Sequence, residues 1–189
     1  MKVVGISGSP RKGGNTECLV NECLNEFTNT GWTAVKHYLS EKYVKPCTGC
    51  DLCAEKGLCS VTDDDAAPLF ADLIDCDAVI IGSPVYYRNV SAQLKAVFDR
   101  NYPYHYRTLE GKPGGAMAVG RGEGAGQAAT LMIIYNYILS CGGLPVPGEM
   151  NGLSAKADKR GDVMLQPRRL EQARILARNV MKYAEKLRK

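Results

Sequence analysis

Short runs in which every residue is apolar or glycine recur along the chain. Val3–Ile6, Ala78–Gly82 and Ala116–Gly120 are such runs, and they are typical of strands that are buried on both faces of a sheet. Thr33–Leu39 is a further candidate strand, and Leu144–Val146 has the length of a short strand at a sheet edge. The pattern therefore predicts five strands.

Segments with apolar residues three and four positions apart separate these runs, and this spacing predicts amphipathic helices. The predicted helices are Thr16–Phe27, a segment that begins at Asp63–Asp65 and continues to Ile74, Ser91–Arg100, Gln127–Leu139 and Leu170–Leu187. Such alternation is typical of a doubly wound α/β fold, in which a parallel sheet has helices on both faces. We expect a single domain over residues 1–189, with ligands at the carboxyl ends of the strands.

Composition narrows the class of protein. With 189 residues, 45% of them hydrophobic and 23% charged, the chain has the values of a globular domain. A net charge of +4 is too small for a strongly basic nucleic-acid-binding domain, and the apolar stretch Leu131–Leu139 is too short to cross a membrane. The N-terminus lacks the apolar core of a secretory signal. We therefore expect a cytoplasmic protein with no nucleic-acid or membrane partner, whose eight cysteines form no structural disulfides.

The loop after the first strand is rich in glycine and in hydrogen-bond donors, and a helix follows it. Backbone N–H groups at such a helix start favour an anion. The candidate phosphate ligands of the loop are Ser7, Ser9, Arg11, Asn15 and Thr16. The loop is not a Walker A motif, because Gly14 stands where that motif has lysine, and Ser7 excludes the dinucleotide fingerprint by standing at its second glycine position.

The loops after the third and fourth strands suit a planar ring. A proline and two tyrosines after the third strand offer flat surfaces and backbone donors, and the candidates are Pro84, Val85, Tyr86, Tyr87 and Asn89. Alternating glycines after the fourth strand leave backbone N–H groups accessible, and the candidates are Gly120, Arg121, Gly122 and Gly124. One phosphate loop and two ring-binding loops predict a mononucleotide site.

These segments resemble the flavodoxin-like NAD(P)H-dependent FMN reductases. The resemblance rests on Ser7–Arg11 with Asn15 and Thr16, on Pro84–Tyr86, and on Gln93–Lys95 with Phe98–Arg100. It implies a parallel sheet of five strands in the order 2-1-3-4-5, with FMN bound across the ends of the first, third and fourth strands.

Half of the cysteines lie in a loop of about residues 46–62, after the second strand, and they are Cys47, Cys50, Cys53 and Cys59. The first three have gaps of two residues, as in the C-x2-C-x2-C run of bacterial ferredoxins, which suits a [4Fe-4S] cluster. The fourth follows after five residues, so the loop is not a ferredoxin domain. A zinc site, which usually has two C-x2-C pairs, and a loop without metal stay open as alternatives.

A flavodoxin-like fold with this cysteine loop resembles the iron–sulfur flavoproteins of anaerobic archaea and bacteria. All four cysteines and the following Asp63 and Asp64 match, whereas Tyr87, Arg88 and Tyr102–Tyr106 depart from the family. The resemblance implies that electrons pass from reduced ferredoxin, or a similar one-electron donor, through the cluster to FMN, with NAD(P)H as a second class of donor. It also implies a homo-oligomer in which cluster and flavin approach across an interface.

Two other functions stay open: an NAD(P)H-dependent FMN or quinone reductase without a functional cluster, and a non-catalytic FMN-binding or zinc-stabilised module. The helix predicted at residues 127–139 supports the homo-oligomer, because apolar side chains cover nearly all of its surface. These side chains are Ala128, Leu131, Met132, Ile133, Ile134, Tyr135, Ile138 and Leu139. Burial under the last helix and the cysteine loop is the alternative explanation.

Overall fold

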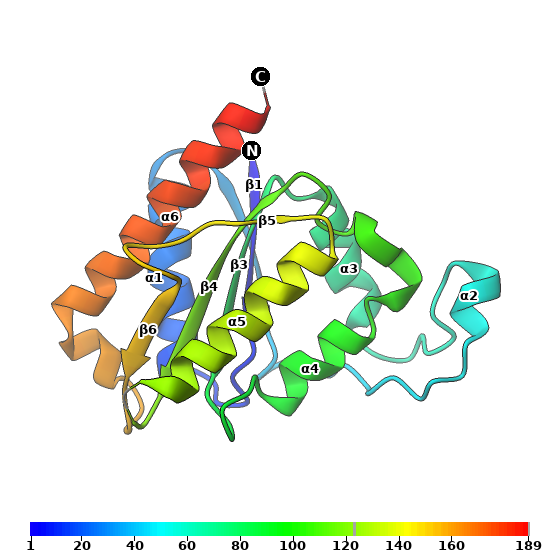
Figure 1. The fold of residues 1–189 in the computed structure, drawn as a ribbon, viewed down its shortest axis with the longest axis horizontal. Helices are drawn as coiled ribbons and strands as arrows, with labels where there is room; N and C mark the ends of the chain where they lie inside the picture. The colour runs from blue at the N-terminus through cyan, green and yellow to red at the C-terminus, as the bar shows by residue number, and fades with distance from the viewer. Residues whose placement is uncertain (123, 189) are drawn as a thin grey trace.

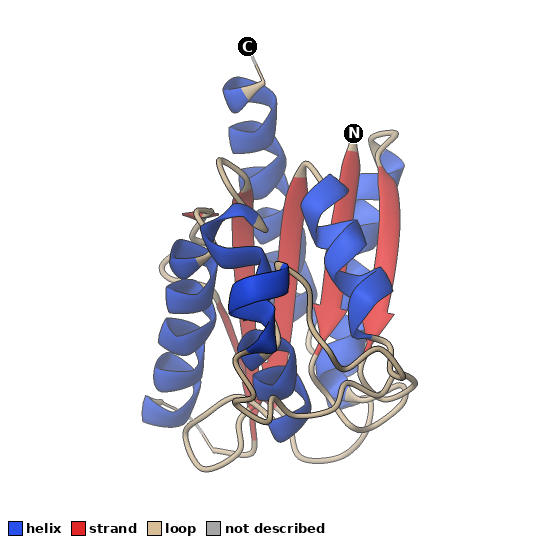
Figure 2. Cartoon of the chain, turned by 90° about the vertical axis from the view of Figure 1, so that its right-hand side faces the viewer, coloured by secondary structure: helices blue, strands red, loops and turns tan. Residues whose placement is uncertain are grey.

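The computed structural model describes residues 1–122 and 124–188, and of His105 and Tyr106 the backbone alone. Its centre is a parallel sheet with the strand order β2-β1-β3-β4-β5, as the family resemblance implies. The strands are β1 (Lys2–Ser7), β2 (Thr33–Tyr38), β3 (Ala78–Pro84), β4 (Pro113–Gly120) and β5 (Leu144–Pro145). The apolar runs of β1, β3 and β4 are buried at almost every position, because helices cover both faces of the sheet (Figure 2).

A short additional strand, β6 (Leu153–Lys156), lengthens the sheet edge beyond β5. β5 pairs with Pro113 and Gly114 of β4, and β6 pairs with Met117–Gly120 of the same strand. The sequence pattern does not reveal β6, because it has four residues of which only two are buried. β6 brings the chain to the carboxyl edge of the sheet, where ligands bind in this fold class.

Helices form a layer on each face of the sheet (Figure 1). They are α1 (Asn15–Asn29), α2 (Leu52–Lys56), α3 (Ala66–Asp75), α4 (Ala92–Asp99), α5 (Ala125–Ser140) and α6 (Pro167–Leu187), with 3-10 helices η1 (Tyr102–Arg107) and η2 (Asp162–Leu165). Side chains of α1 and α6 share one apolar core, and those of α3, α4 and α5 share the core on the opposite face. In the described part of the chain, no helix is both long and apolar enough to cross a membrane.

Helix α5 packs on β4, β5 and β6 and keeps apolar side chains on its outer face. Leu131, Ile134 and Ile138 are buried, whereas Met132 is 66% exposed and Leu139 is 58% exposed. Helix α6 lies on the opposite face of the sheet (Figure 1), so the last helix does not cover these side chains.

The acidic run Asp63–Asp65 does more than start a helix. Asp64 Oδ1 accepts a hydrogen bond from Ala66 N at 3.0 Å, as expected at a helix start, although Asp65 makes no side-chain cap. Asp64 Oδ2 accepts a second hydrogen bond, from Lys45 N at 2.9 Å. Asp64 therefore also binds the chain that enters the cysteine loop.

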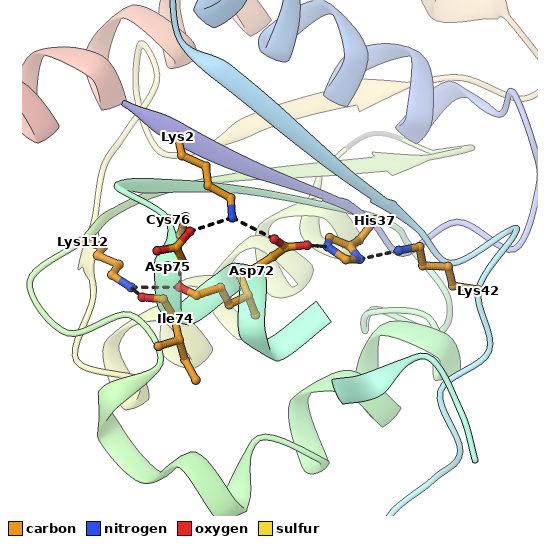
Figure 3. A network of polar contacts seen from close by, with 9 residues as sticks. Lys2, His37, Lys42, Asp72, Ile74, Asp75, Cys76 and Lys112 are labelled. Carbon is orange, nitrogen blue, oxygen red and sulfur yellow. Dashed lines mark hydrogen bonds and ion pairs between the residues drawn. The ribbon is translucent and has the colours of Figure 1, made fainter. Parts of the chain in front are cut away.

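A polar network joins β1, β2 and α3 (Figure 3). Asp72 accepts hydrogen bonds from Lys2 Nζ at 2.8 Å and from His37 Nε2 at 2.9 Å. Lys42 Nζ lies 2.8 Å from His37 Nδ1, and because an ammonium group can only donate, the ring proton is on Nε2. Burial lowers the pKa of His37, which keeps the ring neutral. His37, for which the sequence suggests no role, thus links β2 to the segment before the cysteine loop.

Candidate functional site

A cavity of about 600 Å³ opens at the carboxyl edge of the sheet, where the strands end. All three loops that the sequence singles out contribute to it. The candidate ligands that line it are Ser9, Arg11, Asn15, Thr16, Pro84, Val85, Tyr86, Gly120, Arg121 and Gly122. Of the described candidates, Ser7, Tyr87, Asn89 and Gly124 do not line it.

The start of α1 forms one polar end of this cavity. Gly14 precedes the helix without a side-chain cap, so the first N–H groups of α1 are suited to bind an anion. Ser7 is fully buried beneath the loop, and its Oγ accepts a hydrogen bond from Ser9 N at 3.5 Å. Ser9 Oγ in turn accepts one from Arg11 N at 3.1 Å. The two serines thus order the loop, while Arg11 lines the cavity.

The segment after β6 forms a wall of the cavity that the sequence analysis did not predict, and its lining residues are Ala157, Asp158 and Arg160. Asn15 positions this wall. Its Nδ2 donates a hydrogen bond to Lys159 O at 2.7 Å, and its Oδ1 accepts one from Val163 N at 3.3 Å. Because both polar groups of Asn15 bind protein, this residue acts on the cavity through the wall.

Arginine side chains reach the cavity from three segments, and they are Arg11, Arg121 and Arg160. Arg160 Nε donates to Gly13 O at 3.3 Å, and Arg121 Nε pairs with Asp158 at 2.7 Å. The excess of cationic groups favours an anionic ligand. The charged run at residues 156–160 is the sole sequence signal for this wall, and such runs are common on any surface.

A tight turn after β3 places Tyr86 and Tyr87 in different surroundings. The backbone groups of Tyr86 and Asn89 exchange two hydrogen bonds of 3.0 Å, and between them Tyr87 has a φ of 49° and Arg88 a φ of 61°. Positive φ at both central residues is typical of a type I′ turn, which prefers Asn and Gly. Tyr86 lines the cavity, whereas Tyr87, at the turn, is fully exposed.

Gln127, which was not among the predicted ligands, connects the glycine loop to β6. Its side chain is buried and lines the cavity, and its Nε2 donates to the carbonyl groups of Gly122 and Ala155. Gly124 has a φ of 104° at the start of α5, a conformation that favours glycine, and it lines a different cavity.

All four cysteines of the loop line a second cavity, of about 410 Å³. Helix α2 lies within the loop, and its ends turn sharply, since Asp51 has a φ of 55° and Gly57 a φ of 65°. The hydrogen bond between the Cys50 thiol and Ser60 Oγ, which lies 3.4 Å away, lowers the pKa of this thiol. A lower pKa favours the thiolate, which is the form that binds metals. Among the described residues, no three Cys, His, Asp or Glu side chains are placed to hold one metal ion.

Arg100 follows α4 and binds both ends of the cysteine loop. Nη1 donates to Lys45 O at 3.0 Å, and Nη2 donates to Val61 O at 2.8 Å. Nη1 also donates to Asp64 Oδ2 at 2.7 Å. Only 2% of the Arg100 side chain and 1% of the Asp64 side chain are exposed, so this is a buried ion pair.

Comparisons with known proteins show the family of this chain. The family described as NADPH-dependent FMN reductase matches residues 1–156. An iron–sulfur flavoprotein of Methanocaldococcus jannaschii is 44% identical over 140 residues, which cover 74% of this chain and 72% of that protein. An iron–sulfur flavoprotein of Archaeoglobus fulgidus is 40% identical over 163 residues, which cover 86% of this chain and 73% of the relative. The chain belongs to the iron–sulfur flavoproteins of this reductase family.

A solved structure supports the fold of this iron–sulfur flavoprotein. The WrbA-like flavodoxin of Agrobacterium tumefaciens gives a TM-score of 0.71 at 18% identity, over 98% of this chain and 97% of that chain. The predicted flavodoxin-like fold is therefore confirmed. Family membership also confirms FMN as the cofactor and makes the chain an FMN-dependent oxidoreductase.

The cavity at the strand ends is called the flavin cavity below, and the cavity lined by the four cysteines is called the cysteine cavity. The described residues that line the one do not line the other. In Figure 1, α2 lies to one side of the sheet, away from β6 and the start of α5. The family match ends at residue 156, so the wall that carries Asp158 and Arg160 lies beyond it.

Proposed function

We propose that this flavoprotein is a cytoplasmic electron-transfer oxidoreductase with FMN in the flavin cavity and a [4Fe-4S] cluster in the cysteine cavity. Reduced ferredoxin, or a similar one-electron donor, is the proposed source of electrons, and NAD(P)H is a second donor class. The observation that carries the proposal is the cysteine cavity, which all four cysteines of one loop line. The curated relatives reported above are iron–sulfur flavoproteins, which supports the same pairing.

The flavin cavity fits a mononucleotide. Its volume of about 600 Å³ lies within the range of small-molecule sites. The start of α1 and Arg11 would bind the phosphate, because N–H groups and a guanidinium converge there. Tyr86 and the loop from Gly120 to Gly122 would contact the ring system. FMN has a single phosphate, which the start of α1 would bind.

The cysteine cavity fits a cluster better than a single zinc ion. Structural zinc sites usually take two C-x2-C pairs, whereas three of the cysteines in this loop form the C-x2-C-x2-C run of cluster-binding proteins. A [4Fe-4S] cluster takes four cysteine thiolates, and four cysteines line this cavity of about 410 Å³. Cys47, Cys50, Cys53 and Cys59 would hold it.

The bound groups supply the redox chemistry: an iron–sulfur cluster exchanges single electrons, and a flavin accepts one or two. The chain positions the groups and excludes water. Arg100 and Asp64 fix the base of the cysteine loop, Asn15 fixes the wall of the flavin cavity, and Gln127 fixes the glycine loop. Because the bound groups carry the redox chemistry, the mechanism requires no nucleophile or general base from the chain.

We also propose that copies of the chain associate. The flavin cavity and the cysteine cavity have separate linings, so contact between subunits is a way to shorten the path between them. The exposed Met132 and Leu139 of α5 offer an apolar contact surface. Sedimentation at micromolar concentration tests this, and a mass of one chain would contradict it.

The cluster proposal is tested by anaerobic reconstitution, followed by iron, sulfide and zinc analysis and a visible spectrum. We expect flavin bands, a broad iron–sulfur shoulder and about four irons per chain. Cys50→Ser should lose the cluster while it keeps FMN that dithionite still reduces, and reduction of that FMN by ferredoxin should stop. Cys76→Ser is the matched control, since Cys76 is buried outside the loop and serine can still donate to Leu73 O.

The two alternative functions predict different results in this experiment. Flavin bands without iron would favour an NAD(P)H-dependent FMN or quinone reductase. Zinc in place of iron, with no turnover, would favour a zinc-stabilised module. Ferredoxin-driven reduction of Cys50→Ser at the original rate would contradict a role of the cluster in electron transfer.

A further inference from the structure

One nitrogen atom of the Arg100 side chain, Nε, makes no hydrogen bond with the described residues. Its two Nη atoms donate to Lys45 O, Val61 O and Asp64 Oδ2. Its Nε–H is buried and finds no hydrogen-bond partner among the described residues. Buried donors are nearly always satisfied in folded proteins, so an unsatisfied one indicates an acceptor that comes into place only when the site is occupied.

The cysteine cavity lies beside this donor. Arg100 and Cys59 both line the cysteine cavity, and both also line a neighbouring cavity of about 230 Å³ that contains Phe70 and Tyr104. Burial lowers the pKa of Arg100, but the hydrogen bond and charge of Asp64, followed by the Cys59 thiol, raise it above its usual value. The Arg100 guanidinium and the Cys59 sulfur are therefore close neighbours.

We propose that Arg100 is a positioning residue that donates its Nε–H to the Cys59 sulfur when Cys59 ligates the cluster, and that it thereby raises the reduction potential of the cluster. The inference rests on the proposed function, since it needs a cluster in the cysteine cavity. An iron-bound thiolate is a hydrogen-bond acceptor, and hydrogen bonds to such sulfurs are among the factors that set cluster potentials. The added electron makes the cluster more negative, so a nearby donor and positive charge stabilise the reduced form.

The geometry separates this role from that of a loop anchor. The Nη atoms make the hydrogen bonds to Lys45, Val61 and Asp64, so they suffice to hold the loop. Nε takes no part in that anchoring. Asp64 balances the charge of Arg100, so the directed hydrogen bond is the main difference that the cluster would sense.

The test compares wild type, Arg100→Lys and Lys95→Met after anaerobic reconstitution. Arg100→Lys keeps the charge but loses the planar donor, and we expect its cluster to have a more negative reduction potential in a redox titration followed by electron paramagnetic resonance. Lys95→Met is the matched control, because it removes an exposed cation of α4, the helix that precedes Arg100, and Lys95 pairs only with Asp99 among the described residues. Its potential should equal that of wild type.

A second measurement needs no variant. Wild-type protein labelled with 15N-arginine should show a hyperfine coupling between the reduced cluster and one arginine nitrogen, with an adjacent proton that exchanges in D2O. Because this measurement uses wild-type protein, it tests the proposal even where Arg100→Lys fails to fold. A merely structural Arg100 would lower iron content in the variant without changing the potential of the molecules that keep the cluster.

The outcomes are distinct. Wild-type protein that binds no iron overturns the proposed function and this inference with it. Wild-type protein with a normal cluster, no arginine coupling and an unchanged potential in Arg100→Lys overturns this inference alone. A more negative potential together with the coupling establishes Arg100 as the donor to the cluster.

Discussion

Arg100 and Asp64 form an ion pair in which Nη1 and Oδ2 are 2.7 Å apart and both side chains are almost fully buried. Asp64 follows the cysteine loop, and Arg100 follows α4 on the same face of the sheet. The pair therefore ties the cysteine loop to the helix layer of the flavodoxin fold. Two carbonyl groups at the ends of the loop, those of Lys45 and Val61, complete the contacts of Arg100.

Asp64→Ala should strongly destabilise the protein. The variant leaves Arg100 buried and unpaired, and removal of one partner from a buried pair costs about 3–5 kcal/mol. The free energy of unfolding in urea, measured without cofactor, reports the loss. Asp63→Ala is the control, because the Asp63 side chain is 75% exposed and its contact with Lys45 lies at the surface. Equal losses of unfolding free energy in both variants would show that the buried ion pair stabilises the protein no more than the surface contact does.

The pH dependence of stability should reveal the neutral His37. Burial lowers its pKa in the folded protein, while the unfolded chain has the usual value of about 6.5. The unfolded state therefore binds a proton first as the pH falls, so stability is fully present above about pH 6.5 and is lost below it. Asp72, whose pKa is also lowered on balance, adds a second loss at more acid pH.

Urea unfolding at pH 7.5 and pH 5.5 checks this prediction. Wild type should be less stable at pH 5.5, and His37→Gln should show a much smaller difference between the two pH values. Lys2, Lys42 and Asp72 are the charged groups around the ring, so the variant keeps the rest of the network (Figure 3). A difference of the same size in His37→Gln would assign the acid sensitivity to other groups.

The parts of the fold that the sequence predicts are those set by local pattern. β1, β3 and β4 follow from uninterrupted apolar runs, and α1 and α5 from apolar spacing. β6 is not predictable in this way, because it has four residues and exists through its pairing with β4. For the same reason, the sequence pattern does not predict the wall of the flavin cavity that follows β6.

Polar contacts between residues far apart in the chain are a second feature that the sequence does not predict. Asn15 is recognisable as a polar residue in a phosphate loop, but its partners Lys159 and Val163 lie more than a hundred residues further along the chain. Asp64 looks like a helix-start residue, and its pairing with Arg100 depends on packing between α3 and α4. In both cases the sequence shows the residue type, whereas its partners depend on contacts that form in the folded chain.

A glycine in place of Arg88, in the turn after β3, should stabilise the protein. Arg88 has a φ of 61°, a conformation that costs a residue with a side chain roughly 1–2 kcal/mol. Arg88→Gly removes this strain, partly offset by the greater freedom of glycine in the unfolded chain, so we expect a net gain of about 0.5–1 kcal/mol. Arg88→Val should lower stability, since branched side chains fit this conformation least well. Thermal unfolding distinguishes the three proteins, and a loss in Arg88→Gly would contradict the argument.

Arg11→Ala should weaken FMN binding without changing the fold. Arg11 lines the flavin cavity near the start of α1, and a hydrogen bond to a charged group is worth roughly 1.5–3 kcal/mol. The expected rise in Kd is about 10- to 150-fold. Titration of apoprotein with FMN, followed by quenching of flavin fluorescence, measures it. Arg168→Ala is the control, because Arg168 pairs with Glu149 outside the flavin cavity. An unchanged Kd for Arg11→Ala would remove Arg11 from the phosphate site.

Asn15 and Arg160 should act on FMN as one unit. Asn15 holds the wall through Lys159 O and Val163 N, and Arg160 lies on that wall beside Gly13 O. Each single variant, Asn15→Ala and Arg160→Ala, should weaken FMN binding, the first by loosening the wall and the second by removing a cation. Because loss of the wall already misplaces Arg160, the double variant should bind FMN little worse than Asn15→Ala alone. Residues in one network typically show coupling of about 0.5–3 kcal/mol. Strictly additive losses in this double-mutant cycle would mean that Asn15 contacts FMN directly and that the wall is independent of it.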